Sequence, residues 1–170
     1  APGLELHVST QASTTNWHTV QMWKELGATR VVAAREVSLA DLKEMKDNVD
    51  IEIESFVHGS MCISYSGRCL LSNYMTGNRD ANRGQCSQSC RWKYSLVESN
   101  RPGEYYPIEE DEHGTYIFNS KDLCLIHRIP DLYEAGIDSL KIEGRMKSVH
   151  YCATVAKVYR TAIDTYLKEG

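Results

Sequence analysis

Strand-like and helix-like segments alternate along the first third of this chain of 170 residues. Residues 4–9 and 51–57 have the composition of strands, and residues 14–26 carry apolar side chains at helical spacing. The apolar run VVAA at residues 31–34 is typical of a strand buried on both faces, and Ser38 can cap a short helix after it. This βαβαβ order predicts a parallel α/β sheet.

Regular structure stops near residue 59 and resumes near residue 120. In the second part we expect a helix start at residues 120–122, a helical turn at 132–135, a strand at 139–142 and a final helix at 148–167. The apolar stripe of that final helix includes Cys152, which is therefore predicted to be a core residue.

The α/β pattern predicts part of a barrel of the TIM (β/α) type, since a complete eight-stranded barrel needs about 250 residues. We divide the chain into barrel parts at residues 1–60 and 119–170, a cysteine-rich loop at 61–92 and a small β-rich insertion at 93–118. A partial barrel exposes strand edges and apolar faces, so the isolated chain is expected to associate with itself.

Polar side chains follow several predicted strands, and barrel enzymes carry their chemistry at the carboxyl ends of strands. Glu54 and His58 are four residues apart on one predicted strand, so we expect them on the same face. They suit either proton transfer or a structural pair. Arg35, Glu143 and Arg145 suit either a clamp for an anionic substrate or an ion-pair network at the rim.

Four of the six cysteines lie within one window, residues 62–90, that is rich in Gly, Ser, Asn and Arg. Such clustering favours an iron–sulfur cluster, with a structural zinc site or buried thiols without metal as the alternatives. Only Cys86 and Cys90 have the close spacing that is common among zinc ligands.

The net charge of −4 argues against a globally basic protein that binds nucleic acid. Locally, cations and aromatic side chains alternate in a stretch that suits phosphate contact and base stacking on RNA. The alternative is a solvated loop with one packed tryptophan. The candidate residues are Arg79, Arg83, Arg91, Trp92 and Lys93.

The segments ESFVHGSMC, at residues 54–62, and GRCLLS, at residues 67–72, resemble the signature of the peptidase U32 family. Further similarity at residues 7–13, 82–86, 120–124 and 141–148 extends the resemblance over nearly the whole chain. The branch it resembles contains bacterial proteins once called collagenase-like proteases. Members of that branch are linked to hydroxylation of RNA bases, including the wobble uridine of tRNA. Full-length members are longer, so the chain looks like the family's central segment.

The resemblance implies a [4Fe–4S] cluster on Cys62, Cys69, Cys86 and Cys124, with Cys90 as a reserve ligand. The isolated chain could lose this cluster or take zinc instead. The resemblance also implies RNA, in particular tRNA, as the partner, and a small carboxylate such as prephenate as the oxygen donor.

Three classes of function remain open: an RNA-hydroxylating enzyme, a protease as the family name suggests, and a zinc-stabilised binding module. The protease reading has little support, because the chain contains no HExxH or GxSxG motif and no obvious cysteine–histidine–acid arrangement. No signal peptide opens the sequence and no apolar run reaches the length of a membrane span, so we expect a cytoplasmic protein away from membranes.

Overall fold

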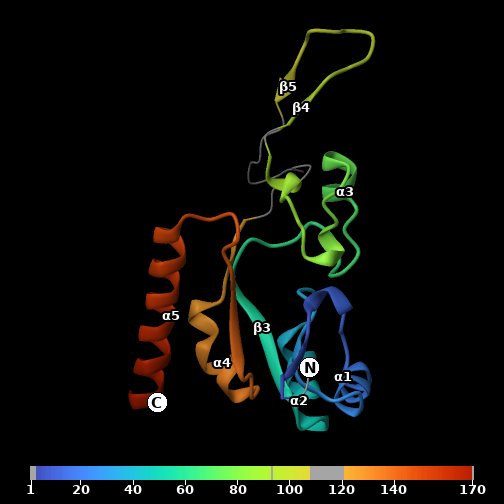
Figure 1. Ribbon diagram of the computed structural model, residues 1–170. Coiled ribbons are helices and arrows are strands. Elements are labelled where there is room, and N and C mark those ends of the chain that lie inside the picture. Colours follow the sequence, from blue (N-terminus) through green and yellow to red (C-terminus); the bar gives the residue numbers. More distant parts are fainter. Residues whose placement is uncertain (1–2, 93, 108–120, 170) are drawn as a thin grey trace.

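The computed structural model describes residues 3–92, 94–107 and 121–169 (Figure 1). Its main sheet contains four parallel strands in the order β1 (Leu6–Val8), β2 (Ala28–Val32), β3 (Glu52–Gly59) and β7 (Ser139–Glu143). The short strand β6 (Leu123–Cys124) pairs antiparallel with the end of β3. The predicted mixed α/β fold is confirmed, and the sheet is open rather than closed.

The helices that accompany the sheet begin where the sequence provides caps. The side chain of Asn16 accepts a hydrogen bond from the backbone of Thr19, and Ser38 and Asp41 form a reciprocal capping box. Gly136 follows the fourth helix with a positive φ of 74°, which only glycine adopts readily. The helices are α1 (Trp17–Glu25), α2 (Leu39–Asn48), α4 (Ile129–Glu134) and α5 (Val149–Glu169).

Two clusters of buried side chains join these helices to the sheet. The first packs α1 and α2 against β1–β3 through residues such as Val20, Met45 and Ile53, all fully buried. The second packs α4 and α5 against the end of β3 through Val57 and Tyr159, among others. In both, burial of aliphatic side chains from α/β crossover units supplies the main stabilisation.

Between Gly59 and Leu123 the described part of the chain makes a long excursion away from the main sheet. It contains the helix α3 (Leu71–Thr76) and the hairpin strands β4 (Ser95–Leu96) and β5 (Tyr106–Pro107). The excursion closes at its base, because Leu123 returns opposite Gly59 in the pairing of β6 with β3. Figure 1 shows the β4–β5 hairpin projecting far from the sheet, beyond α3.

After residue 59 the structure differs from the sequence-based expectations in two places. The predicted helix start at residues 120–122 is wrong, because residues 121–122 are not helical and lead into strand β6. Helix α3 was not expected from the sequence. For the β-rich insertion, the hairpin β4–β5 lies in the predicted range, whereas residues 93 and 108–118 lie outside the described residues.

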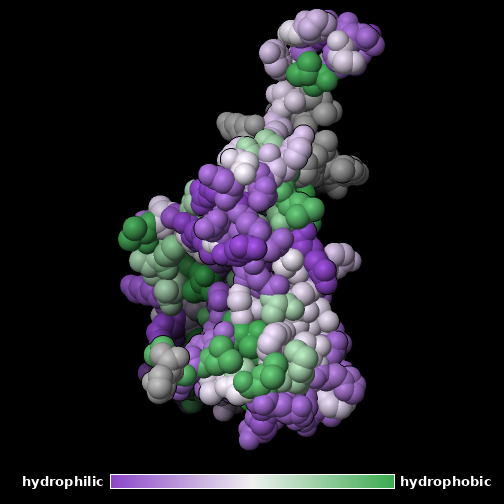
Figure 2. Space-filling view, turned by 45° about the vertical axis from the view of Figure 1, so that its right-hand side comes forward, coloured by the Kyte–Doolittle hydropathy of each residue, from purple (hydrophilic) through white to green (hydrophobic). Residues whose placement is uncertain are grey.

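The surface combines polar and apolar areas. Figure 2 shows hydrophilic residues gathered midway along the molecule, between the β4–β5 hairpin and the sheet. Within the described part of the chain, none of the helices has both the length and the apolar character that a membrane crossing requires.

Candidate functional site

Glu54 is the centre of a polar network on the sheet face opposite the helices. Its carboxylate accepts hydrogen bonds of 2.9 Å from Ser139 Oγ and from Lys141 Nζ, and Arg30 lies 3.6 Å away. Burial alone would raise the pKa of Glu54, but the hydrogen bonds and the positive charges lower it below its usual value. Glu54 is therefore an ionised residue that holds Lys141 in place.

Arg35 lies at the carboxyl end of β2, over the ring of Phe56. Its guanidinium carbon is 4.2 Å from the ring centroid, and its Nη2 is 3.9 Å from a carboxylate oxygen of Glu143. The Nε atom of Arg35 is buried and has no hydrogen-bond partner among the described residues. A guanidinium with an unused buried donor is suited to an additional anionic ligand.

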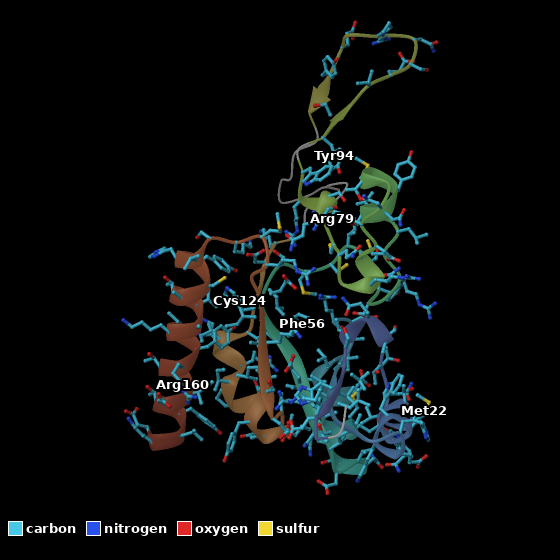
Figure 3. All side chains as sticks on the ribbon, in the orientation of Figure 1. Met22, Phe56, Arg79, Tyr94, Cys124 and Arg160 are labelled. Atoms are coloured by element: carbon cyan, nitrogen blue, oxygen red, sulfur yellow. The ribbon has the colours of Figure 1, made fainter. Side chains whose placement is uncertain are left out.

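A cavity of 270 Å³, which we call the thiol cavity, opens where these strand ends meet the cysteine-rich loop. Figure 3 shows this junction, with Phe56 on the sheet and Arg79 in the loop beyond it. The wall combines three thiols with four cations and one carboxylate. These residues are Cys62, Cys86, Cys90, Arg35, Arg91, Lys141, Arg145 and Glu143.

Two of the thiols that line this cavity have raised pKa values. Burial raises the pKa of Cys62, and Cys69 and Cys86 raise it further, while Arg35 lowers it. Burial also raises the pKa of Cys90, with smaller contributions of the same sign from Cys62, Cys86 and Cys69. These contributions place Cys69 and Cys86 within electrostatic range of Cys62 and Cys90, and Cys62, Cys86 and Cys90 line one cavity.

The remaining two cysteines lie elsewhere. Cys124 is exposed on β6, opposite His58, and does not line the thiol cavity. Cys152 is half-buried on α5, where its Sγ lies 3.6 Å from the carbonyl oxygen of Gly144. The expected fourth ligand, Cys124, thus reaches the end of β3 without joining the other three.

The donor set suits a metal centre in its chemistry, since clustered thiols are the usual ligands of iron–sulfur clusters and of zinc. However, no three His, Cys, Asp or Glu side chains in the described ranges are arranged to hold a single metal ion. The residues therefore fit a cluster in type and in neighbourhood, and ligation would require the loop to draw the thiols together.

His58 does not share the face of Glu54, so this expectation is wrong. Between Phe56 and His58 the pairing of β3 with β7 shifts by one residue, which is a β-bulge. The bulge turns the imidazole toward α5, where its ring centroid lies 5.5 Å from that of Tyr159. The Nδ1 atom of His58 is buried without a hydrogen-bond partner among the described residues.

Two of the predicted RNA-binding cations stabilise the cysteine-rich loop through hydrogen bonds to its backbone. Arg79 donates to the carbonyl oxygens of Gln85 and Cys86, at 3.2 and 3.4 Å, and Arg91 donates to that of Met61 at 2.8 Å. Arg145 joins the end of β7 to the same loop through the carbonyl oxygen of Gly84, at 2.9 Å.

Other candidates for RNA contact remain accessible. The side chain of Arg83 is 84% exposed, although its Nε lies 3.5 Å from the carboxylate of Asp80. Trp92 is 46% exposed. Lys93 lies outside the described residues.

The sequence interpretation missed Lys141 and Asp122. Lys141 alternates with Ser139 and Glu143 along β7, and this period of two could have identified all three as facing the site. Asp122 binds Lys147 at 2.7 Å and the Tyr151 hydroxyl at 2.9 Å. Burial would raise the pKa of Asp122, but these partners lower it, and no local pattern predicts their meeting.

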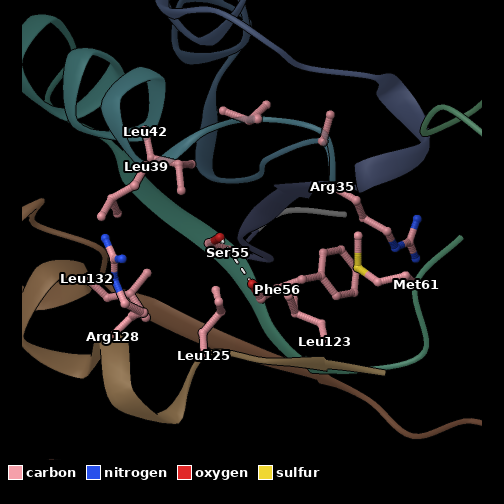
Figure 4. Close-up of a pocket in the computed structure, with 12 residues that line it drawn as sticks. Arg35, Leu39, Leu42, Ser55, Phe56, Met61, Leu123, Leu125, Arg128 and Leu132 are labelled. Atoms are coloured by element: carbon pink, nitrogen blue, oxygen red, sulfur yellow. Dashed lines mark hydrogen bonds between the residues drawn. The ribbon is translucent and has the colours of Figure 1, made fainter. Parts of the chain in front are cut away.

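An apolar cavity of 270 Å³ adjoins the site on the helix side (Figure 4). Leu39 and Leu42 from α2 face Leu132 from α4 across it, and Arg35 and Met61 lie at one end. It belongs to the gap between the two core clusters, because Leu39 packs against both of them.

Comparisons with known proteins give consistent matches. The sequence profile of "Peptidase family U32" matches residues 1–170. The chain is 57% identical over 98% of its length to tRNA hydroxylation protein P1 of Bacillus subtilis, and covers 39% of that protein. It is 43% identical over 96% of its length to tRNA hydroxylation protein P of Escherichia coli, covering 45% of it.

A further relative acts on a different RNA by name. The chain is 35% identical, over 99% of its length, to a 23S rRNA 5-hydroxycytidine synthase of Escherichia coli, and covers 24% of that protein. The chain thus spans less than half the length of each of these three relatives. No solved structure matches it.

Proposed function

The chain belongs to peptidase family U32, and we propose that it forms the cluster-binding part of an enzyme that hydroxylates RNA bases, with a uridine of tRNA as the substrate. Relatives named for tRNA hydroxylation and for 5-hydroxycytidine synthesis support this reaction class. Because the chain covers less than half of each of them, the activity is proposed for the whole protein.

The observation that carries the proposal is the cavity in which thiols and cations meet. Arg35, Lys141 and Arg145 line it together with Glu143. With Arg91, the wall holds four cations against one carboxylate, which suits a small anionic co-substrate. We assign to Arg35, Lys141 and Arg145 the carboxylate of the oxygen donor, for which prephenate is the candidate. Glu54 acts by positioning Lys141, with which it shares a hydrogen bond of 2.9 Å.

We assign Cys62, Cys69, Cys86 and Cys124 to a [4Fe–4S] cluster, with Cys90 in reserve. A bound cluster would supply electron transfer beside the cavity. The first three cysteines share one neighbourhood. Strand β6 delivers Cys124 to the end of β3, from which the chain continues to Cys62. Cys90 lines the cavity already and is the competing candidate for the fourth position.

We also propose that the open parallel sheet is part of a (β/α) barrel. The strand order β1-β2-β3-β7, with helices on one face and the polar network on the other, supports this arrangement. The cavity at the carboxyl ends of β2, β3 and β7 would then lie where barrel enzymes hold their active sites.

The protease alternative gains no support from the structure. A cysteine protease needs an activated thiolate, whereas burial raises the pKa of Cys62 and Cys90. Cys124 lies opposite His58, yet no described hydrogen bond joins the two. Metal analysis of the purified protein would separate a zinc-stabilised module from an iron–sulfur enzyme.

Serine substitutions in the whole protein, purified without oxygen, test the cluster assignment. Cys62→Ser, Cys69→Ser, Cys86→Ser and Cys124→Ser should each abolish iron incorporation, and Cys152→Ser, the matched control, should retain it. Retention of iron in Cys124→Ser with its loss in Cys90→Ser would transfer the fourth position to Cys90. In parallel, RNA from cells lacking the gene should lack a hydroxylated pyrimidine, and an unchanged nucleoside profile would contradict the proposed function.

A further inference from the structure

A cavity of 530 Å³ adjoins the thiol cavity and shares Arg35, Met61 and Cys62 with it. The rest of its wall comes from Glu36 and from residues 63–65 and 68 of the cysteine-rich loop. Its volume is within the range of pockets that hold small molecules and is large enough for a nucleotide. We call it the turn cavity.

A tight turn builds the mouth of the turn cavity. The backbone amide of Arg68 donates to the carbonyl oxygen of Tyr65 at 3.1 Å, and Gly67 has a φ of +72°. This geometry places Tyr65 and Arg68 at the two ends of one turn, and the positive φ at the third position explains the glycine. The two residues are therefore close along the backbone, and both line the turn cavity.

The turn rests on a rigid base. Ser66 is 1% exposed, and its Oγ donates to the carboxylate of Glu36 at 3.0 Å and accepts from the amide of Arg35 at 3.0 Å. A Cβ atom at Gly67 would overlap the carbonyl oxygen of Gln11, so the loop lies directly on the segment after β1. The backbone of Tyr65 and Arg68 is thus held in place before any ligand arrives.

The side chains on this base are turned to solvent. Tyr65 is 73% exposed and Ile63 is 44% exposed. Within the described ranges, neither the Tyr65 hydroxyl nor the Arg68 guanidinium has a hydrogen-bond or ion-pair partner. Arg68 differs in this from Arg79 and Arg91, which donate to backbone carbonyls.

The positive charge of the cysteine-rich loop favours an anionic ligand. The cysteine-rich loop carries four arginines and a single acidic residue, Asp80, although the net charge of the chain is −4. A cationic loop that presents an exposed aromatic ring and a free guanidinium on the wall of one cavity is a combination by which proteins bind single-stranded RNA.

We propose that the turn cavity receives one nucleotide of the RNA substrate. Tyr65 stacks on the base, and Arg68 contacts the phosphate. Arg35 lines both cavities, so the bound base lies next to the thiol cavity. The assignment rests on the proposed function, and it defines where the RNA enters.

Binding of unmodified tRNA, prepared from cells that lack the gene, to the whole protein tests the assignment. Fluorescence anisotropy at fixed salt should show roughly ten-fold weaker binding for Tyr65→Ala and near-normal binding for Tyr65→Phe, which keeps the stacking face. Arg68→Ala should weaken binding and make its dependence on salt concentration shallower by about one ion, whereas Arg68→Lys should retain that dependence. Tyr74→Ala is the matched control, because Tyr74 is 84% exposed on α3 but does not line the cavity.

Photo-crosslinking of tRNA that contains 4-thiouridine gives a second measurement, and the crosslinked peptide should contain Tyr65. Normal binding by Tyr65→Ala and Arg68→Ala, in a protein that still hydroxylates tRNA, would overturn the cavity assignment and leave the proposed function intact. An equal loss of tRNA affinity in Tyr74→Ala would also overturn the cavity assignment, because it would indicate that RNA binds across the whole loop surface. If the wild-type protein bound no tRNA and the gene deletion left every hydroxylated nucleoside in place, both proposals would fall.

Discussion

Tyr159 shows how one buried hydroxyl can hold two backbone segments together. It donates to the carbonyl oxygen of Val57 at 2.7 Å and accepts from the amide of Leu125 at 3.1 Å. Tyr159→Phe removes both of these hydrogen bonds, while the direct bond of 2.9 Å from the Leu125 amide to the Val57 carbonyl oxygen remains. The free energy of unfolding should therefore fall by roughly 0.5–1.5 kcal/mol in urea titrations. Tyr166→Phe on the same helix is the control, because the described residues offer its hydroxyl no hydrogen bond. Equal effects of the two changes would contradict this role.

Glu54 makes the stability of the sheet depend on acid pH. Its pKa in the folded chain is lower than the ordinary value, so the unfolded chain binds the proton more tightly. The stabilisation by Glu54 is therefore complete above the ordinary carboxyl pKa and is lost as the pH falls through the lowered, folded value.

Glu54→Gln tests this dependence. The free energy of unfolding at pH 7 should fall by roughly 1–2 kcal/mol, because Lys141 loses its charged partner, whereas Arg30 keeps its ion pair of 2.6 Å with Glu52. The loss of stability below pH 5 should also become less steep in urea titrations over a pH series. Glu44→Gln, at an exposed position on α2, should change neither quantity. If the free energy of unfolding falls just as steeply below pH 5 in Glu54→Gln, this carboxylate is not the source of that pH dependence.

At the scale of single residues, the sequence identified the site in part. Arg35 and Glu143 were found because polar residues at the carboxyl ends of parallel strands meet at one edge of a sheet. His58 was misplaced because a β-bulge reverses the alternation of faces, and a bulge depends on pairing with β7, which no local pattern records.

Among the elements, the junction of β3 and β7 depends on a glycine. Gly59 has a φ of +101°, and a Cβ atom there would overlap the carbonyl oxygen of Glu143. Gly77 has a similar φ of +76° but open space around it. In thermal or urea unfolding, Gly77→Ala should cost about 1 kcal/mol for the backbone conformation alone. Gly59→Ala should cost about 2–3 kcal/mol more, because the two strands must separate. Similar costs would show that the close approach is unimportant.

Strands and helices were predictable where the local pattern and the tertiary packing agree. The buried run before residue 35 and the cap at Ser38 identified β2 and α2 within a few residues. Helix α3 was missed because it is only six residues long and leaves Tyr74 in solvent, so it has no apolar stripe. The cap-like composition of residues 120–122 wrongly predicted a helix start, because residues 123 and 124 pair with β3 and form a strand.

For the molecule as a whole, the isolated chain should associate with itself. The edge strand β1 exposes Leu6 at 50%, and Leu4 before it is 77% exposed. Along α5, Val149 is 86% exposed and Val158 is 49% exposed. Light scattering should therefore give a mass that rises with concentration, because unpaired edges and apolar faces bind one another. Leu6→Lys should reduce the effect, and a strict monomer at high concentration would contradict the prediction.

The closed base of the long excursion has a consequence for how such chains can change in length during evolution. Because Leu123 returns opposite Gly59, an inserted or deleted segment between them leaves the register of the sheet untouched. Doubling the length of such a loop costs only about 0.6 kcal/mol. The stretch from Cys62 to Cys90 is held by the arginine contacts and by the turn at Gly67. Natural variation in length should therefore concentrate beyond Cys90, around the β4–β5 hairpin, and spare the thiols.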